Sequence, residues 1–210
     1  MAAAASAAAV ATSARNHRTV LVLIDCQQSF IRGYWMSGVD PAEVLPLHSA
    51  FDRVAALLPK LSTDVRLLVT QCLFPTVQDF ALYPPISDAL DARGAGTVKR
   101  VIKPGNSILH AAGSTQWFDE LAGPATANVD SEPGVPTVVL GGCTLTSCIR
   151  VSALDLYRHY FDKNTSQPRL KICVDLNLCA ARASNYIRRC HACMSQVSRC
   201  FNSMTFHLHS

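Results

Sequence analysis

Three residues that together can perform hydrolysis follow predicted β-strands in this sequence. Asp25 ends an apolar run that begins at Thr19, Lys103 follows a more polar run from Thr97, and Cys148 lies just after a later strand. A cysteine acts as a nucleophile when a neighbouring cation stabilises its thiolate, and a carboxylate can carry protons between substrate and leaving group. The set therefore predicts cysteine-based hydrolysis, provided that the fold brings the three side chains together.

Each residue also has an ordinary structural interpretation. A cysteine in a helix is often buried and unreactive. An aspartate after a strand often forms a turn, and a lysine before Pro104 and Gly105 is often a solvated loop charge. The chemical hypothesis rests on the three occurring together.

The stretch 137–160 organises the chain. It begins with four residues typical of a strand (137–140), is expected to turn at Gly141 and Gly142, and continues as a helix from Leu145. Cys148 falls in the first turn of this helix, where unpaired N–H groups and the helix dipole favour a thiolate. Ligands of such sheets gather at the carboxyl ends of the strands, so this is a plausible place for chemistry.

The rest of the chain alternates in the same way. Strands are expected at 19–24, 65–71, 97–102, 170–174 and 204–208, helices at 41–60, 115–121 and 180–200, and loops at 74–85, 123–136 and 161–168. The third strand is polar enough to be an edge. This order predicts an α/β fold: a three-layer α/β/α sandwich around a parallel, doubly wound sheet of about six strands, formed by residues 18–210 as one domain.

Composition excludes several classes. The 210 residues are 49% hydrophobic and 16% charged, which indicates a globular chain, and the net charge of +4 comes from dispersed basic residues. We therefore expect no nucleic-acid partner. No apolar run approaches the length of a membrane span, so no membrane partner is expected either.

The nine cysteines are odd in number and fall partly inside predicted elements, which favours a reducing, cytoplasmic compartment over a disulfide scaffold. Residues 1–17 are rich in alanine and contain no acidic residue. They are expected to be a disordered leader, with a mitochondrial presequence as the weaker alternative.

Three motifs in order resemble one family. LVLIDCQQSF (Leu21–Phe30) resembles a strand followed by D-x-Q-x-x-F, VIKPGNSIL (Val101–Leu109) resembles a K-P segment, and GGCTLTSCI (Gly141–Ile149) resembles a nucleophile turn. Together they make the chain similar to the isochorismatase-like cysteine hydrolases, which include nicotinamidases and carbamoylsarcosine amidohydrolases. The resemblance runs from about Val20 to Ala180.

The resemblance implies a role for each matched position. Asp25 would be the general base and acid, Lys103 the charge partner and Cys148 the nucleophile. A cis peptide between Cys143 and Thr144 is implied, with the backbone N–H groups of Thr144 and Cys148 as the oxyanion hole. Gln27 and Phe30 would shape a pocket for a small-molecule substrate, joined by Trp35 from the aromatic loop that follows. Relatives commonly form homo-oligomers, and the same assembly is expected here.

The sequence departs from the family in three places. Leu145 and Thr146 replace a common Thr-Asp pair, although the Thr146 hydroxyl remains available as a helix cap. Metal-dependent nicotinamidases carry Asp-x-His after the second strand, whereas this chain has QCLF at 71–74. We therefore expect no metal and no cofactor. A loop at 161–168 replaces a turn at glycine.

Other cysteines receive structural interpretations. Cys190, Cys193 and Cys200, with His207 and His209, lack the spacing of a zinc site. Cys26 and Cys72 flank strand ends, where packing is the default role and lining the site is the alternative.

The leading function is cleavage of a C–N bond in a small amide or ureide through a thioester. The alternatives are vinyl ether hydrolysis of the isochorismatase type, which needs no nucleophilic cysteine, and a catalytically silent binding module.

Overall fold

Six parallel strands form the main sheet. The computed structural model describes residues 19–94, 96–123, 135–164, 167–185 and 205–207. The strands are β1 (Thr19–Ile24), β2 (Arg66–Cys72), β3 (Val98–Lys103), β4 (Thr137–Cys143), β7 (Lys171–Ala180) and β8 (Thr205–His207), in the spatial order β3-β2-β1-β4-β7-β8. All neighbouring pairs are parallel. A short antiparallel ribbon joins β5 (Phe161–Asp162) to β6 (Gln167–Pro168).

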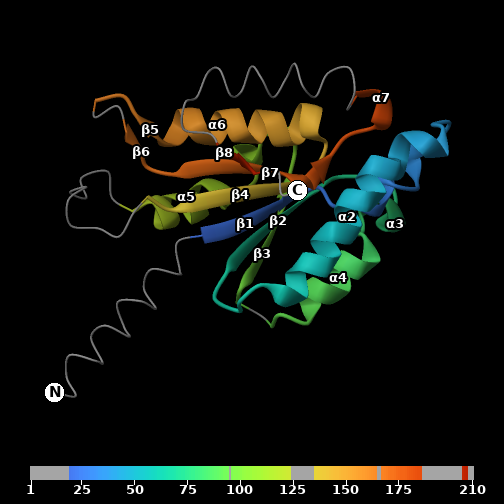
Figure 1. The fold of residues 1–210 in the computed structure, drawn as a ribbon, viewed down its shortest axis with the longest axis horizontal. Coiled ribbons are helices and arrows are strands. Elements are labelled where there is room, and N and C mark those ends of the chain that lie inside the picture. The colour runs from blue at the N-terminus through green and yellow to red at the C-terminus, as the bar shows by residue number, and fades with distance from the viewer. Residues whose placement is uncertain (1–18, 95, 124–134, 165–166, 186–204, 208–210) are drawn as a thin grey trace.

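Helices cover both faces of this sheet (Figure 1). On one face lie α5 (Ser114–Ala122) and α6 (Arg150–Tyr160), and on the other lie α2 (Leu45–Leu57) and α4 (Pro84–Asp91). Each layer packs its apolar side chains against the sheet in a separate buried cluster. The expected three-layer, doubly wound α/β fold is therefore confirmed.

Strand order follows from the residues that each strand carries. The central strand β1 is apolar from Val20 to Ile24 and fully covered, because both of its faces meet helices. β3 carries Lys99 and Arg100 and lies at the edge, as its polarity predicted. The short final strand expected near 204–208 is observed as β8.

Several boundaries differ from the expectation. β4 runs through Gly141 and Gly142 to Cys143, so these glycines belong to the strand and not to a turn. β7 extends to Ala180 and bulges between its two regions of pairing with β4. The expected long loop at 74–85 contains α3 (Val77–Phe80) and the start of α4, where Pro84 and Pro85 occupy the first helical turn that tolerates proline.

The helix expected over 41–60 is divided. A 3₁₀ turn at Pro41–Val44 leads into α2, and a second at Leu58–Lys60 ends it. Further 3₁₀ turns lie at Gln28–Phe30, Tyr34–Met36 and Ile108–His110, and α7 is the short helix Ala183–Asn185.

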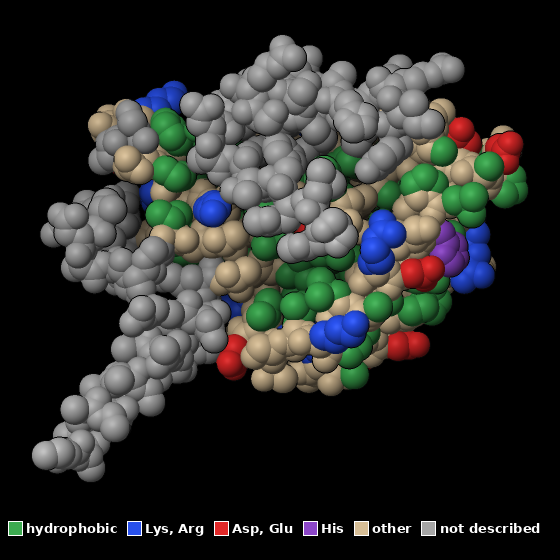
Figure 2. All heavy atoms as spheres, in the orientation of Figure 1, with side chains coloured by type: hydrophobic (Ala, Val, Ile, Leu, Met, Phe, Trp, Pro, Cys, Tyr) green, Lys and Arg blue, Asp and Glu red, His purple; other side chains and the backbone are tan. Residues whose placement is uncertain are grey.

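Some expectations lie outside the described residues. These are the leader at 1–17, the loop at 124–134, most of the helix at 180–200 and the cysteines at 190, 193 and 200. Within the described part of the chain, no helix has the length and apolar character needed to cross a membrane. Figure 2 shows Lys and Arg side chains separated from one another on the visible face, as the dispersed basic residues predicted.

Gly142 allows β4 to lie close to β1. Its φ is +112°, and a Cβ added there would lie 2.1 Å from the carbonyl oxygen of Ile24. We expect Gly142→Ala to lower the free energy of unfolding by at least about 2 kcal/mol, because the crowding falls on backbone that cannot move aside. Urea unfolding measures this. Gly38→Ala is the matched control, because Gly38 also has a positive φ but nothing within 4 Å; equal losses in the two variants would contradict the crowding argument.

Candidate active site

The site lies at the carboxyl ends of three neighbouring strands. Asp25 follows β1 directly, Cys72 ends β2, and Lys103 ends β3 opposite Cys72. Asp25 has a φ of +53°, in the left-handed region that few non-glycine residues adopt. Its backbone N–H donates to the Thr70 carbonyl at 3.2 Å, and this contact holds the unusual conformation. Outliers of this kind cluster at functional sites.

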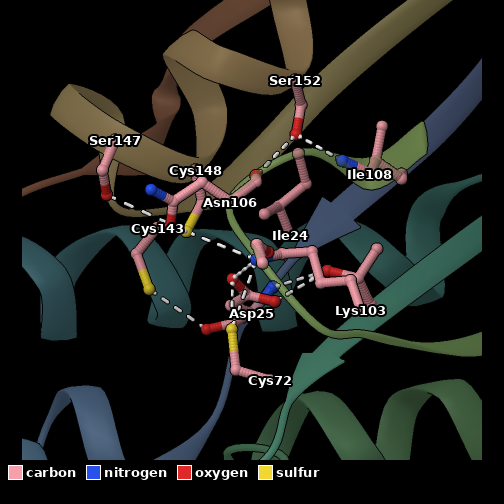
Figure 3. A network of polar contacts seen from close by, with 12 residues as sticks. Ile24, Asp25, Cys72, Lys103, Asn106, Ile108, Cys143, Ser147, Cys148 and Ser152 are labelled. Atoms are coloured by element: carbon pink, nitrogen blue, oxygen red, sulfur yellow. Dashed lines mark hydrogen bonds and ion pairs between the residues drawn. The ribbon is translucent and has the colours of Figure 1, made fainter. Parts of the chain in front are cut away.

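Cys148 reaches the same place from the segment after β4. Leu145–Ile149 forms a single π-helical turn that continues into α6. Such turns are rare and occur often at functional sites. Figure 3 shows the side chains of Asp25, Cys72, Lys103 and Cys148 pointing toward one another from their separate elements.

The Lys103 ammonium joins the group. Its Nζ lies 2.8 Å from Asp25 Oδ2 and 3.4 Å from Cys148 Sγ. It also lies 3.3 Å from Cys72 Sγ and donates to the Gly105 carbonyl at 2.7 Å. The prediction that Asp25, Lys103 and Cys148 converge at one edge of the sheet is confirmed.

These side chains are removed from solvent. Asp25 is 0% exposed, Lys103 1% and Cys148 5%. The interpretation of Lys103 as a solvated loop charge is therefore wrong: it belongs to a strand and ends in a buried ion pair. A buried charge is tolerated when it is paired and hydrogen-bonded, and Lys103 meets both conditions.

Proton counting distinguishes the two thiols. The ammonium has three N–H groups but four neighbours: Asp25, Gly105, Cys72 and Cys148. Cys72 Sγ lies 3.0 Å from Asp25 Oδ2, and its single proton can be donated either to that oxygen or to a thiolate at Cys148. The other carboxylate oxygen, Oδ1, accepts the Thr70 hydroxyl at 2.8 Å. Cys72 is thus a neutral thiol beside Asp25, which leaves the ammonium to support a thiolate at Cys148.

The electrostatics agree with this assignment. A hydrogen bond from Cys72 lowers the pKa of Cys148, and the Lys103 charge lowers it further, against the opposing effects of burial and of Asp25. The same hydrogen bond, with burial and the Asp25 charge, raises the pKa of Cys72. Burial alone would lower the pKa of Lys103, but the charges of Asp25 and Cys148 raise it. The ammonium therefore stays charged.

The turn before Cys148 matches the expected backbone. The peptide bond between Cys143 and Thr144 is cis. Thr144 Oγ1 and Ser147 Oγ share a short hydrogen bond, and the Ser147 hydroxyl also donates to Cys148 Sγ at 3.8 Å. Thr146 does not cap the helix, because Thr144 occupies the N-cap position. The Thr144 side chain makes no capping hydrogen bond to the backbone either. The oxyanion hole at the N–H groups of Thr144 and Cys148 stays a prediction.

The structure gives Gln27 a different role from the expected lining of the pocket. Its amide is fully buried; Nε2 donates to the carbonyls of Cys72 and Phe80, and Oε1 accepts the Cys72 N–H at 2.7 Å. Because all of these partners are backbone groups, Gln27 fixes the end of β2 and does not face a substrate. It thereby positions Cys72.

The two expected aromatic residues pack together. The Phe30 ring lies 4.9 Å from that of Trp35 and 5.5 Å from that of Phe74. The Arg182 guanidinium lies 4.0 Å above Trp35, and its Nη2 donates to the Trp35 carbonyl. Phe30 is buried and Trp35 is partly exposed, so of the two Trp35 is the better placed to meet a ligand. Their contact with substrate stays a prediction.

The segment after β2 does not fit the metal pair of the nicotinamidases. Leu73 is 69% exposed and Phe74 packs on Phe30, and neither side chain carries a carboxylate or an imidazole. Among the described residues, one group has the composition of a metal site, namely Asp25, Cys72 and Cys148, whose ligand atoms lie within 4.8 Å of one another. Lys103 Nζ contacts all three side chains, so the positive charge next to these ligand atoms is a lysine ammonium.

Cys72 is the site residue to which the sequence assigned a packing role by default. If its S–H proton stabilises the Cys148 thiolate, Cys72→Ala should raise the pKa of Cys148 by about one unit, since a hydrogen bond to a charged group contributes about 1.5–3 kcal/mol and other contacts compensate in part. Iodoacetamide alkylation of Cys148 as a function of pH measures this. Cys72→Ser keeps a donor and should retain most of the wild-type curve; identical curves for the alanine variant and wild type would refute the role.

Comparison with known proteins gives the fold a name. Neither models of protein families nor curated protein sequences match this chain. Among solved structures, nicotinamidase from Bacillus subtilis superposes with a TM-score of 0.63 at 14% identity, covering 90% of this chain and 99% of that one. An isochorismatase from Pseudomonas putida gives 0.59 at 12% identity over 90% and 87%, and a pyrazinamidase/nicotinamidase from Streptococcus mutans gives 0.61 at 15% over 90% and 99%. The chain therefore has the isochorismatase-like fold that its motifs predicted.

Proposed function

We propose that this chain is a cysteine hydrolase that cleaves the C–N bond of a small amide or ureide through a thioester at Cys148. The observation that carries the proposal is the buried Lys103 ammonium, which contacts both the Asp25 carboxylate and the Cys148 sulfur. Nicotinamidases among the structural neighbours cleave a bond of this class, which supports the choice, although identities of 12–15% leave the substrate open.

The first half of the reaction would form the acyl-enzyme. The Cys148 thiolate attacks the carbonyl carbon, and the N–H groups of Thr144 and Cys148 stabilise the negative oxygen. Cys148 and Asp25 hold one proton between them: it moves from the Cys148 thiol to Asp25 as the thiolate forms, and Asp25 then passes it to the departing nitrogen. The C–N bond breaks, ammonia or an amine leaves, and the acyl group remains on sulfur.

The second half would regenerate the thiolate. Asp25, again a carboxylate, removes a proton from water, and the hydroxide attacks the thioester carbonyl. The C–S bond breaks and the acid leaves. Lys103 keeps its charge throughout and stabilises whichever of its two partners is anionic.

Vinyl ether hydrolysis is the second candidate within this fold. It requires Asp25 but no nucleophile, so it leaves unexplained why a cysteine with a lowered pKa lies 3.4 Å from a buried ammonium. A silent binding module leaves the same arrangement unexplained.

A screen for ammonia release tests the proposal. Wild type, Cys148→Ala and Asp25→Asn are incubated with panels of primary amides, ureides and pyridine carboxamides, and a vinyl ether is included as a separate substrate. Ammonia release by wild type alone is the expected result. Vinyl ether turnover that survives in Cys148→Ala, or slow alkylation of Cys148 together with no turnover, would replace the proposal with the second candidate or with the silent module, respectively.

A further inference from the structure

A second thiol lies beside the candidate nucleophile, and the proposed hydrolysis does not use it as a reacting group. Cys72 Sγ and Cys148 Sγ lie within 4.8 Å of each other, and both contact Lys103 Nζ, at 3.3 and 3.4 Å. Cys148 is buried, but Cys72 is partly exposed at the end of β2. The pair is therefore close together and open to small molecules from one side.

The geometry points to a reversible oxidation site, in which a hydroperoxide converts Cys72 and Cys148 into a disulfide that blocks the nucleophile. Reactive thiols that form sulfenic acids are typically thiolates with a second cysteine nearby to resolve them, and the two residues divide these roles. The inference concerns thiol chemistry alone and holds whatever the substrate of the site.

In the first step the Cys148 thiolate attacks one oxygen of hydrogen peroxide. The S–O bond forms, the O–O bond breaks, and the departing hydroxide takes up the proton that Cys148 released on ionising and becomes water. The sulfur loses two electrons and the peroxide gains them. Lys103 favours this step because it holds Cys148 in the nucleophilic, anionic form.

In the second step Cys72 resolves the sulfenic acid. Once Cys148 is no longer a thiolate, the Cys72 proton is free to be donated to Asp25 Oδ2, 3.0 Å away, so the carboxylate can accept it as Cys72 Sγ attacks Cys148 Sγ. The S–S bond forms, the S–O bond breaks, and hydroxide leaves with that proton as a second water. Overall, two thiols and one peroxide give one disulfide and two waters.

The first step prepares the second. While Cys148 is a thiolate, the hydrogen bond to it is the largest cause that raises the pKa of Cys72. Once Cys148 is a neutral sulfenic acid this cause disappears, and the Lys103 ammonium, 3.3 Å from Cys72 Sγ, supports a thiolate there instead. The Lys103 ammonium thus stabilises a thiolate first at Cys148 and then at Cys72.

The neighbouring cysteines lack this combination. Cys26 and Cys143 are fully buried, and burial raises the pKa of both. Cys143 Sγ donates to the Asp25 carbonyl at 3.1 Å, away from the ammonium. These thiols therefore stay protonated and slow to react.

Peptide mapping after peroxide treatment tests the inference. Trypsin places Cys72 alone in peptide 67–93 and places Cys148 with Cys143 in peptide 101–150. Brief exposure of the whole chain to hydrogen peroxide should link these two peptides with the loss of two hydrogens. Iodoacetamide labelling of Cys148 should fall in parallel, and dithiothreitol should restore most of it.

Two variants make the result decisive. Cys72→Ser keeps a hydrogen-bond donor next to Cys148 but removes the resolving sulfur, so the linkage should vanish and Cys148 should proceed to sulfinic acid, with labelling that dithiothreitol does not restore. Cys148→Ser should also abolish the linkage, which excludes Cys143 as the partner. Cys173→Ser, near the start of β7, is the matched control and should behave as wild type. Wild type that forms no linkage and loses Cys148 irreversibly at the rate of Cys72→Ser would overturn the inference.

Discussion

Replacing Cys148 with alanine is expected to lower turnover of any amide substrate by at least about a thousandfold, because the covalent route disappears with the sulfur. Wild type mixed with substrate and quenched in acid should carry the acyl group on peptide 101–150, and the variant should carry none. Mass spectrometry of that peptide measures the intermediate directly.

The same variant should fold normally. The Asp25 charge opposes ionisation of Cys148, so removing the thiolate relieves a repulsion while it costs the contact with Lys103. We expect the free energy of unfolding to change by no more than about 1 kcal/mol, since the two effects oppose each other. Cys173→Ala provides a control for the loss of a buried sulfur elsewhere. A folded Cys148→Ala enzyme with turnover within tenfold of wild type would contradict nucleophilic catalysis.

Local sequence patterns were sufficient to predict which strands lie at the centre and at the edge of the main sheet. The apolar run of β1 and the polar run of β3 each carry information about their place, because burial on both faces requires apolar side chains and an edge does not. The long form of β4 was not predictable in the same way. Gly141 and Gly142 are typical of a turn. Inside the strand, the close approach of the Ile24 backbone explains Gly142, and the nearby Leu178, 3.0 Å from an added Cβ, crowds Gly141.

The convergence of Asp25, Lys103 and Cys148 was predictable because each lies at or shortly after the carboxyl end of a strand, and these ends meet at one edge of a parallel sheet. Cys72 and Gln27 were not, because their roles depend on register. Cys72 lies at the site because β2 pairs with β3 in the register that places it opposite Lys103. The Gln27 amide points away from the site because it donates to backbone carbonyls 45 and 53 residues further along the chain. Such contacts have no local signature. The expected homo-oligomer and small-molecule partner stay predictions.

Removing the Lys103 charge should affect stability and reactivity together. In Lys103→Met the apolar stem remains but Asp25 keeps a buried charge without its partner, 2.8 Å from where the ammonium lay. Breaking one side of a buried pair costs about 3–5 kcal/mol, so urea unfolding should show a large loss. The Cys148 thiolate loses the same cation, and its pKa should rise by about 1–3 units. Alkylation at neutral pH should therefore slow by about tenfold or more.

A second substitution separates the two effects. Lys103→Met combined with Asp25→Asn removes both charges, so it should recover much of the lost stability, because no unpaired ion remains. It should not recover turnover, since the proton carrier is gone. Lys103→Arg should rescue neither property fully, because a planar guanidinium cannot occupy the place of a compact ammonium enclosed by Asp25, Gly105 and two sulfurs. If Lys103→Met matches wild type in both urea midpoint and alkylation curve, the ammonium supports neither the fold nor the thiolate, and the proposed mechanism loses its central cation.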